Sequence, residues 1–163
     1  MKKLILSSIA LAAILFLFSS CAQDSKTELT EKQKEAIIIE VKQVFEYTLG
    51  GIENRDAERA FSSFSKKEGA RLVQEGYIVP DIDAEKNEYA KGFSKPGPKT
   101  KITCDPLFFD ILDLNTVLVT TIGSIENVEE KNPDEKPWII AYTMLFKKEA
   151  EGWKVRNMHM SWK

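Results

Sequence analysis

The sequence predicts an α+β domain in which helices from the first half of the chain pack on one face of an antiparallel sheet from the second half. Three observations support this prediction. Apolar residues recur with a helical period between residues 30 and 93, the period changes to two between residues 101 and 162, and the strand-like segments follow one another through short connections. Helices that precede a strand meander are typical of an α+β architecture.

The first helix is expected to begin after Thr30. Thr30 and Gln33 fit a capping box, in which each side chain bonds to the backbone N–H of the other residue. A single apolar stripe follows, and Gly50-Gly51 is expected to end or bend the helix. The stripe consists of Ile37, Val41, Val44, Phe45, Thr48 and Ile52.

The remaining elements have weaker but readable signals. A short second helix is expected after Asp56, and a third is expected after Asp83 with its end at Gly92. Residues 66–80 fit either a helical turn or a short strand. β-Branched and aromatic residues then predict four strands, at 101–112, 117–126, 138–148 and 153–162.

Composition excludes several classes of protein. A chain of 163 residues has room for one ordinary domain. Its 23 basic and 25 acidic residues nearly cancel, so nucleic acid is not an expected partner, because phosphate binding needs a basic face. Two cysteines and one histidine are too few for a disulfide scaffold, a zinc ribbon or an iron–sulfur cluster. We therefore expect no metal and no cofactor.

The first twenty residues have the pattern of a signal peptide. Lys2 and Lys3 precede an apolar run over residues 4–18, and small residues follow. The run has about fifteen residues, fewer than the roughly twenty that a membrane-spanning helix needs. Ser19-Ser20-Cys21 resembles the lipobox of bacterial lipoproteins, which implies that Cys21 is lipidated and becomes the new N-terminus.

The lipobox resemblance also implies a location. Cys21 would tie the protein to the lipid bilayer of the cell envelope, and Ala22 in place of aspartate implies the outer membrane. An ordinary cleaved secretory signal is the alternative. We thus expect a lipoprotein signal peptide over residues 1–20, a polar tether over 21–29 and the folded domain over 30–163.

The final hairpin carries the most specific pattern in the chain. The strand Tyr142–Lys148 is followed by Gly152-Trp153-Lys154-Val155 and then by His159-Met160-Ser161. These residues resemble the closing pattern of SnoaL-like polyketide cyclase relatives and of the calcium/calmodulin-dependent kinase II association domain. Both groups belong to the nuclear transport factor 2-like superfamily. Arg55-Asp56-Ala57 also lies where those families place a G-D-x turn.

This resemblance implies a cone-shaped domain with about three N-terminal helices packed on a curved, mainly antiparallel sheet. The open end of the cone is often a ligand or active-site cavity in this superfamily. Cyclases, isomerases, dehydratases, transport factors and assembly domains share the fold, which therefore does not choose a function. The association domain has an arginine after the strand threonine, where this chain has Met144, so an anion-binding pocket of that kind is not implied.

His159 is the only histidine and the natural candidate for acid–base chemistry. Strict alternation places Trp153, Val155, Asn157 and His159 on one face of the last strand, unless a bulge changes the face midway. The alternative is that His159 forms hydrogen bonds within the sheet or across a dimer interface.

Other residue types allow a second kind of site. A ketosteroid-isomerase-like site needs a carboxylate base with a tyrosine or a protonated acid as donor. Five residues supply these types, although Tyr47 lies off the helical stripe and two of the aspartates flank a turn: Asp105, Asp110, Asp113, Tyr47 and Tyr142. A group of six aromatic and thioether residues, which again includes Tyr142, is more often core than cofactor site and would make any cavity apolar and adaptable. The six are Trp138, Tyr142, Met144, Met158, Met160 and Trp162.

The expected function is a membrane-tethered, non-catalytic domain of the cell envelope that binds a small apolar ligand or a protein partner. The expected ligand-binding residues are Tyr142, Met144, Asn157 and His159. One alternative is a cavity enzyme of polyketide-cyclase or ketosteroid-isomerase type that uses His159 or an aspartate. Another is a structural dimer whose cone is filled by its own side chains. The strand over 138–146 is apolar on both faces, which predicts a homodimer through one face of the sheet.

Overall fold

The structure is a computed structural model that describes residues 28–128 and 136–163. The expected signal peptide, Cys21 and residues 21–27 of the expected tether lie outside the described residues. Among the described residues, no helix combines the length and the apolar character needed to span a membrane.

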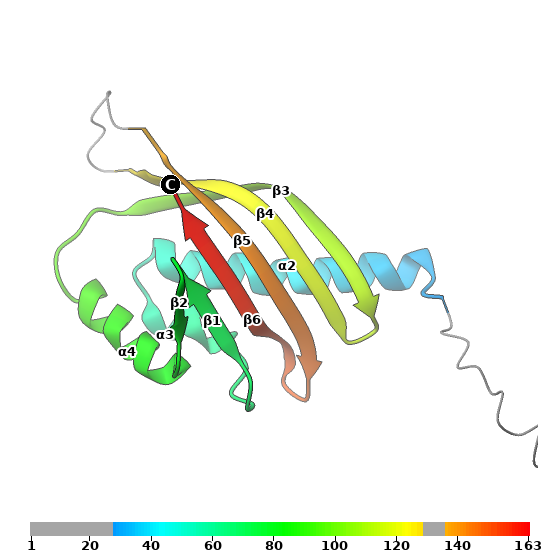
Figure 1. The fold of residues 1–163 in the computed structure, drawn as a ribbon. Coiled ribbons are helices and arrows are strands. Elements are labelled where there is room, and N and C mark those ends of the chain that lie inside the picture. Colours follow the sequence, from blue (N-terminus) through cyan, green and yellow to red (C-terminus); the bar gives the residue numbers. More distant parts are fainter. Residues whose placement is uncertain (1–27, 129–135) are drawn as a thin grey trace, which may run out of the picture.

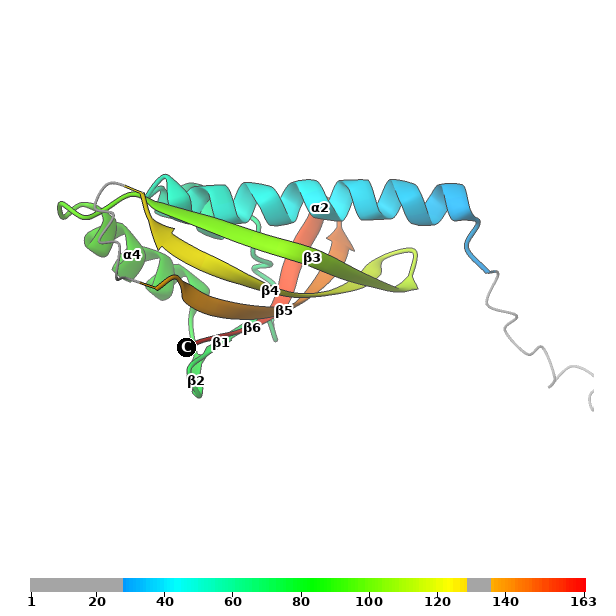
Figure 2. The same cartoon turned by 90° about the horizontal axis from the view of Figure 1, so that it is seen from above.

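As predicted, helices pack on one face of a sheet (Figure 1). The sheet has six strands. The sheet has the order β2-β1-β6-β5-β4-β3, in which β1 and β6 are parallel and the other neighbours are antiparallel. Figure 2 shows α2 along one side of the curved sheet, with α4 near the end where α2 finishes. The elements are α2 (Glu31–Glu53), α3 (Ala57–Ser62), β1 (Arg71–Gln74), β2 (Tyr77–Val79), α4 (Ile82–Phe93), β3 (Thr100–Asp113), β4 (Thr116–Asn127), β5 (Trp138–Glu149) and β6 (Gly152–Trp162).

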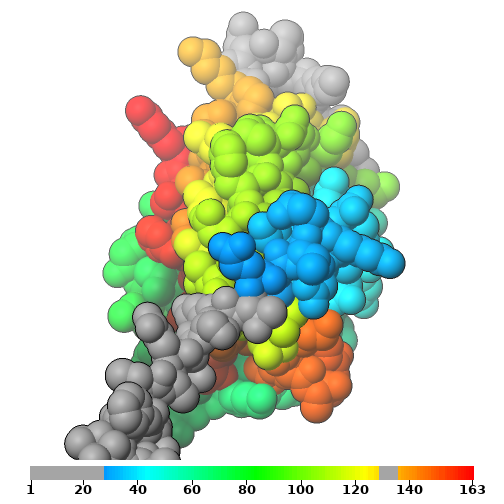
Figure 3. Space-filling view, turned by 90° about the vertical axis from the view of Figure 1, so that its right-hand side faces the viewer, coloured from blue at the N-terminus to red at the C-terminus, as the bar shows by residue number. Residues whose placement is uncertain are grey.

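The predicted start of the long helix is confirmed. The Thr30 hydroxyl accepts from the Gln33 N–H at 3.3 Å, and Gln33 Oε1 accepts from the Thr30 N–H at 2.9 Å, which is the complete capping box. The buried face of α2 follows the predicted stripe closely. Viewed along α2 from its beginning, the first turns of the helix lie against β3 (Figure 3).

The first helix does not end at Gly50-Gly51 but two residues later, at Glu53. The two glycines are buried where α3 crosses α2. A Cβ at Gly51 would lie 2.3 Å from the backbone N of Ala60, and one at Gly50 would lie 2.2 Å from Nη2 of Arg59. The glycines therefore permit the close approach of the two helices.

The short elements differ from the prediction in detail. Asp56 caps α3 as expected, accepting from the Arg59 N–H at 2.9 Å. The cap of α4 is Asp81 and not Asp83, because Asp81 Oδ1 accepts from the N–H groups of residues 83 and 84. The helix consequently begins earlier than expected, and it includes Gly92. Residues 66–80, which were compatible with a turn or a strand, contain the hairpin β1–β2.

The four predicted strands are confirmed as β3 to β6, and the last strand contains a bulge. Leu145 of β5 pairs with Asn157, whereas the next residue, Phe146, pairs with Val155, so Arg156 is an extra residue. The Arg156 side chain donates to Ser65 Oγ at 3.1 Å and to the Glu68 carbonyl. It thereby fastens the segment that leads into β1 to the bulge.

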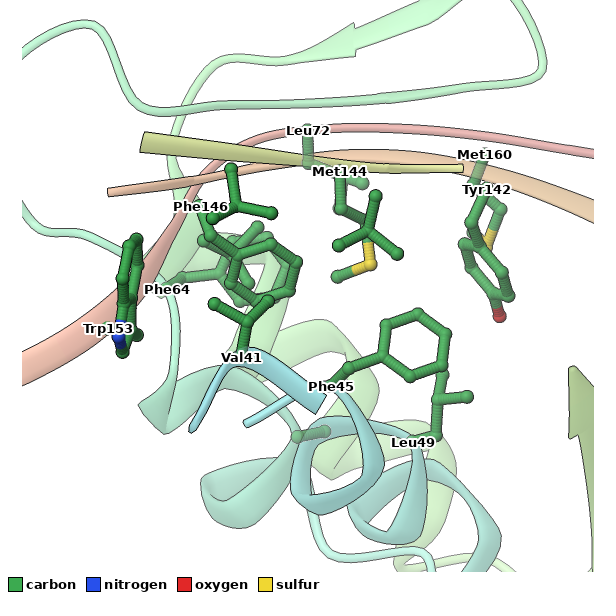
Figure 4. Close-up of a cluster of buried hydrophobic side chains, with 14 of the residues drawn as sticks. Val41, Phe45, Leu49, Phe64, Leu72, Tyr142, Met144, Phe146, Trp153 and Met160 are labelled. Atoms are coloured by element: carbon green, nitrogen blue, oxygen red, sulfur yellow. The ribbon is translucent and has the colours of Figure 1, made fainter. Parts of the chain in front are cut away.

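The core lies between α2 and the inner face of the sheet, which is the face that α2 covers (Figure 4). Val41 and Phe45 from the helix meet Met144 and Phe146 from β5. At the border of the core, Trp153 Nε1 donates to Glu40 Oε2 at 2.7 Å, and Lys148 Nζ reaches the same oxygen at 2.9 Å. Hydrogen bonds from Lys148 and Trp153 lower the pKa of Glu40 below its ordinary value.

Candidate functional site

A cavity of about 240 Å³ opens between the second half of α2, the helices α3 and α4, and the inner face of the sheet. Thr48 and Leu49 line it from α2, and Phe61 lines it from α3. The sheet contributes mainly thioether and aromatic side chains, which are Tyr142, Met144, Met158 and Met160.

Two tryptophans lie at the rim of the cavity. Trp138, at the start of β5, is 57% exposed, and Trp162, at the end of β6, is 37% exposed. Tyr89 of α4 completes this part of the lining and packs edge-on against Phe61, with the ring centroids 5.0 Å apart. Arg55 holds the end of α4 through hydrogen bonds to backbone carbonyls, including that of Lys95 at 2.8 Å.

No charged side chain lines the cavity within the part of the chain that the structure describes. The Thr48 hydroxyl donates to the Val44 carbonyl at 2.8 Å, so its proton is already engaged. Tyr142 is 3% exposed and makes an edge contact with Phe45 at 6.3 Å between ring centroids. Burial raises the pKa of Tyr142 far above its ordinary value, so the phenol stays neutral and keeps its proton.

The structure brings together two of the four residues that we expected to bind ligand. Tyr142 and Met144 line the cavity, whereas Asn157 and His159 lie on the outer face of the sheet. The bulge at Arg156 is the cause, since it breaks the strict alternation that would place His159 on the same face as Trp153.

Asn157 and His159 instead line a shallow hollow of about 380 Å³ on the outer face. Arg71 of β1 and Leu118 of β4 border the same hollow. The imidazole is therefore separated from the cavity by the sheet itself.

The other candidate acid–base groups also lie away from the cavity. Asp105 and Asp110 are exposed on β3, and Asp113 accepts hydrogen bonds from Asn115 and Thr116 in the turn that follows. Tyr47 is exposed on α2. No group of three or more His, Cys, Asp or Glu side chains suited to a metal occurs among the described residues.

Cys104 is half-buried in β3 and is a free thiol. Burial and the nearby Glu53 carboxylate raise the pKa of the Cys104 thiol to about 11. The thiolate is the nucleophilic form, so Cys104 is held in its unreactive form at neutral pH.

The helical part of the lining was not predicted as a site. Leu49, Phe61 and Tyr89 have ordinary apolar patterns that indicate burial and nothing more. Whether a buried side chain meets another side chain or a cavity depends on where the sheet curves away from α2, and that curvature has no local signal.

The chain resembles known proteins in its structure and not in its sequence. No family model matches the chain, and no curated protein matches its sequence. Solved structures do match. An NTF2-like protein of unknown function from Pseudomonas putida is 11% identical with a TM-score of 0.66, and the match covers 78% of this chain and 87% of that one.

Two further structures extend this comparison. A suspected scytalone dehydratase from Novosphingobium aromaticivorans is 13% identical with a TM-score of 0.62, over 82% of this chain and 89% of that one. A suspected kinase II association domain from Xanthomonas campestris is 14% identical with a TM-score of 0.60, over 75% of this chain and 84% of that one. The resemblance in the last hairpin is thus confirmed at the level of architecture, and the chain has the nuclear transport factor 2-like fold.

Proposed function

We propose that the protein binds a small, mainly apolar molecule in this cavity and does not transform it. The observation that carries the proposal is a cavity wall of apolar side chains in which the most deeply buried hydroxyl belongs to Tyr142. Burial of apolar surface is favourable by about 25 cal/mol per Å². Acid–base catalysis would need a carboxylate or an imidazole within hydrogen-bond reach of the ligand, and the described lining offers neither.

Filling the cavity should abolish binding without unfolding the protein. Ile125 lines the cavity from β4 and is half-buried, so Ile125→Trp is expected to occupy ligand space. Leu114→Trp is the matched control, because Leu114 is an exposed apolar residue of the turn before β4 and lies outside the cavity lining. We expect at least a tenfold loss of affinity for an apolar fluorescent dye in Ile125→Trp alone.

Native mass spectrometry of the protein from its own host provides the complementary measurement. A small molecule retained by the unsubstituted protein and by Leu114→Trp, but not by Ile125→Trp, would support the proposal. Equal dye binding by both variants would contradict it. Conversion of the bound molecule to an isomer that differs in chromatographic retention time would instead support the alternative, a cavity enzyme of cyclase or isomerase type.

We further propose that the domain is lipid-anchored at the outer membrane through Cys21. The support is the sequence pattern: a charged start, a short apolar run and the lipobox-like Ser19-Ser20-Cys21. Several acyl chains on one cysteine would give stable anchoring, since each buried methylene contributes about 0.8 kcal/mol.

A homodimer through the outer face of the sheet is the third part of the proposal. Phe108, Ile122 and Ile139 are exposed on the outer faces of β3, β4 and β5, and half-buried Leu118 and Leu145 pair with each other in the row beyond Phe108. Large apolar side chains exposed on one face of a sheet are typical of protein interfaces. A second copy of the chain would cover this face.

One variant tests both parts. Cys21→Ser is expected to move the protein from the membrane fraction to the soluble fraction, because the acylated thiol is removed. The released protein should sediment as a dimer at micromolar concentration. Unchanged membrane association would refute the anchor, and a monomer would refute the dimer.

A further inference from the structure

We propose that the cavity selects neutral molecules that carry one hydrogen-bond acceptor, such as a carbonyl oxygen, and that Tyr142 is the residue that recognises this acceptor. The inference deepens the proposed function and rests on it. Its basis is the depth of the Tyr142 hydroxyl, since Tyr142 is the most buried residue of the lining that carries a hydroxyl or an indole N–H, whereas Tyr89, Trp138 and Trp162 lie at the more exposed rim.

The Tyr142 ring is held in place from both sides. Its strand neighbours are Thr121 in β4 and Met160 in β6, and Figure 4 shows Phe45 and Leu49 of α2 pointing toward it. The phenol therefore points from the sheet toward the helix, into the region that the cavity occupies.

Two other buried hydroxyls near the cavity, those of Thr121 and Thr48, donate elsewhere. Thr121 Oγ1 donates to the Pro106 carbonyl at 2.8 Å, and Thr48 Oγ1 donates to the Val44 carbonyl at 2.8 Å. Among the described residues no hydrogen bond to the Tyr142 hydroxyl is found. A hydroxyl in an apolar cavity is unfavourable without a partner, and an acceptor oxygen on the ligand would supply one.

The charge of the ligand follows from the same lining. A carboxylate in the cavity would lose its hydration without gaining a cationic partner, because the described lining has no lysine, arginine or histidine. The acceptor is therefore a neutral oxygen, such as that of a ketone, an aldehyde or an ester.

The size of the ligand follows from the cavity volume. An engineered cavity of about 150 Å³ holds benzene, and the cavity here has about 240 Å³. If the number of ligand atoms scales with cavity volume from the six carbons of benzene, this cavity accommodates roughly ten non-hydrogen atoms. This is the size of a small fused bicycle or of a short acyl chain.

A matched pair of probes tests the inference. 1-Indanone and 1-methyleneindane have the same size and shape, but only the ketone has an acceptor. Their dissociation constants are measured for the unsubstituted protein, for Tyr142→Phe and for the control Tyr77→Phe, which changes an exposed tyrosine outside the cavity lining. Comparing the ratio of the two constants between proteins cancels the different hydrophobicity of the probes.

We expect the preference for the ketone to fall by roughly three- to tenfold in Tyr142→Phe, the effect of one neutral hydrogen bond, and to stay unchanged in Tyr77→Phe. The same ratio in all three proteins would overturn the inference while leaving the proposed function intact. Failure of both probes to bind the unsubstituted protein would overturn both.

A measurement on the unsubstituted protein keeps the inference testable if Tyr142→Phe does not fold. The infrared carbonyl stretch of bound 1-indanone is expected at a lower frequency than in an alkane solvent, because a donated hydrogen bond weakens the C=O bond. A frequency equal to that in alkane would overturn the assignment of Tyr142 as the donor.

Discussion

Trp153→Ala is expected to remove about 3–5 kcal/mol from the free energy of unfolding, a large share of the roughly 5–15 kcal/mol that holds a domain together. The indole is 5% exposed and closes the core beside α2. Its Nε1 donates to Glu40 at 2.7 Å, and Lys148 lies over the ring at 5.5 Å from the centroid. Alanine would leave a cavity and remove both contacts.

Urea denaturation followed by circular dichroism measures this loss. The matched control is Trp162→Ala, at the opposite end of the same strand, where the indole is 37% exposed. This control should lose markedly less stability, because water already reaches its ring. Similar midpoints for the two variants would refute the assignment of Trp153 as the core anchor.

Gly51→Ala is expected to destabilise the domain strongly, although helix propensity alone favours alanine over glycine. Alanine in place of glycine ordinarily stabilises a helix by about 1 kcal/mol. At Gly51, however, the added Cβ would lie 2.3 Å from the Ala60 nitrogen and 2.6 Å from its Cα. Backbone cannot rotate away as a side chain can, so α3 would have to separate from α2. The expected net loss in the free energy of unfolding is about 1–3 kcal/mol or more, the range typical of overpacking.

Gly92→Ala is the control for this prediction. Gly92 also lies inside a helix, but a Cβ there meets nothing within 4 Å. The substitution should be neutral or stabilising by up to about 1 kcal/mol. Thermal unfolding of both variants gives the comparison, and a neutral Gly51→Ala would contradict the proposed close contact.

Displacement of α3 would also affect the cavity. Ala60 and Phe61 line it from that helix. A Gly51→Ala protein that still folds is therefore expected to bind the apolar dye more weakly, whereas Gly92→Ala should bind it normally.

The features that could be predicted from the sequence are those with a local cause. Thr30 and Asp56 cap helices through contacts three residues away, and alternation within each long strand is visible in the chain itself. The same alternation puts Tyr142 and Met144 on one face of β5. The structure keeps these local features because no tertiary contact opposes them.

The predictions that failed depend on distant partners. Gly51 resembles a helix end until Ala60 is known to cross it. The strand β1 is short, and its parallel pairing with β6 has no local signature. The face of His159 depends on a bulge, which is fastened by the bond from Arg156 to Ser65 about ninety residues earlier in the chain.

The bulge makes the chemistry of the cavity depend on one irregularity of the backbone in the last strand. Odd-numbered side chains such as Val155 face inward before Arg156, and even-numbered ones such as Met158 and Met160 face inward after it. The same residues in a strand without the bulge would turn His159 toward the cavity and Met160 toward solvent with no side chain altered. The bulge thus decides whether this part of the cavity wall is a thioether surface or an imidazole.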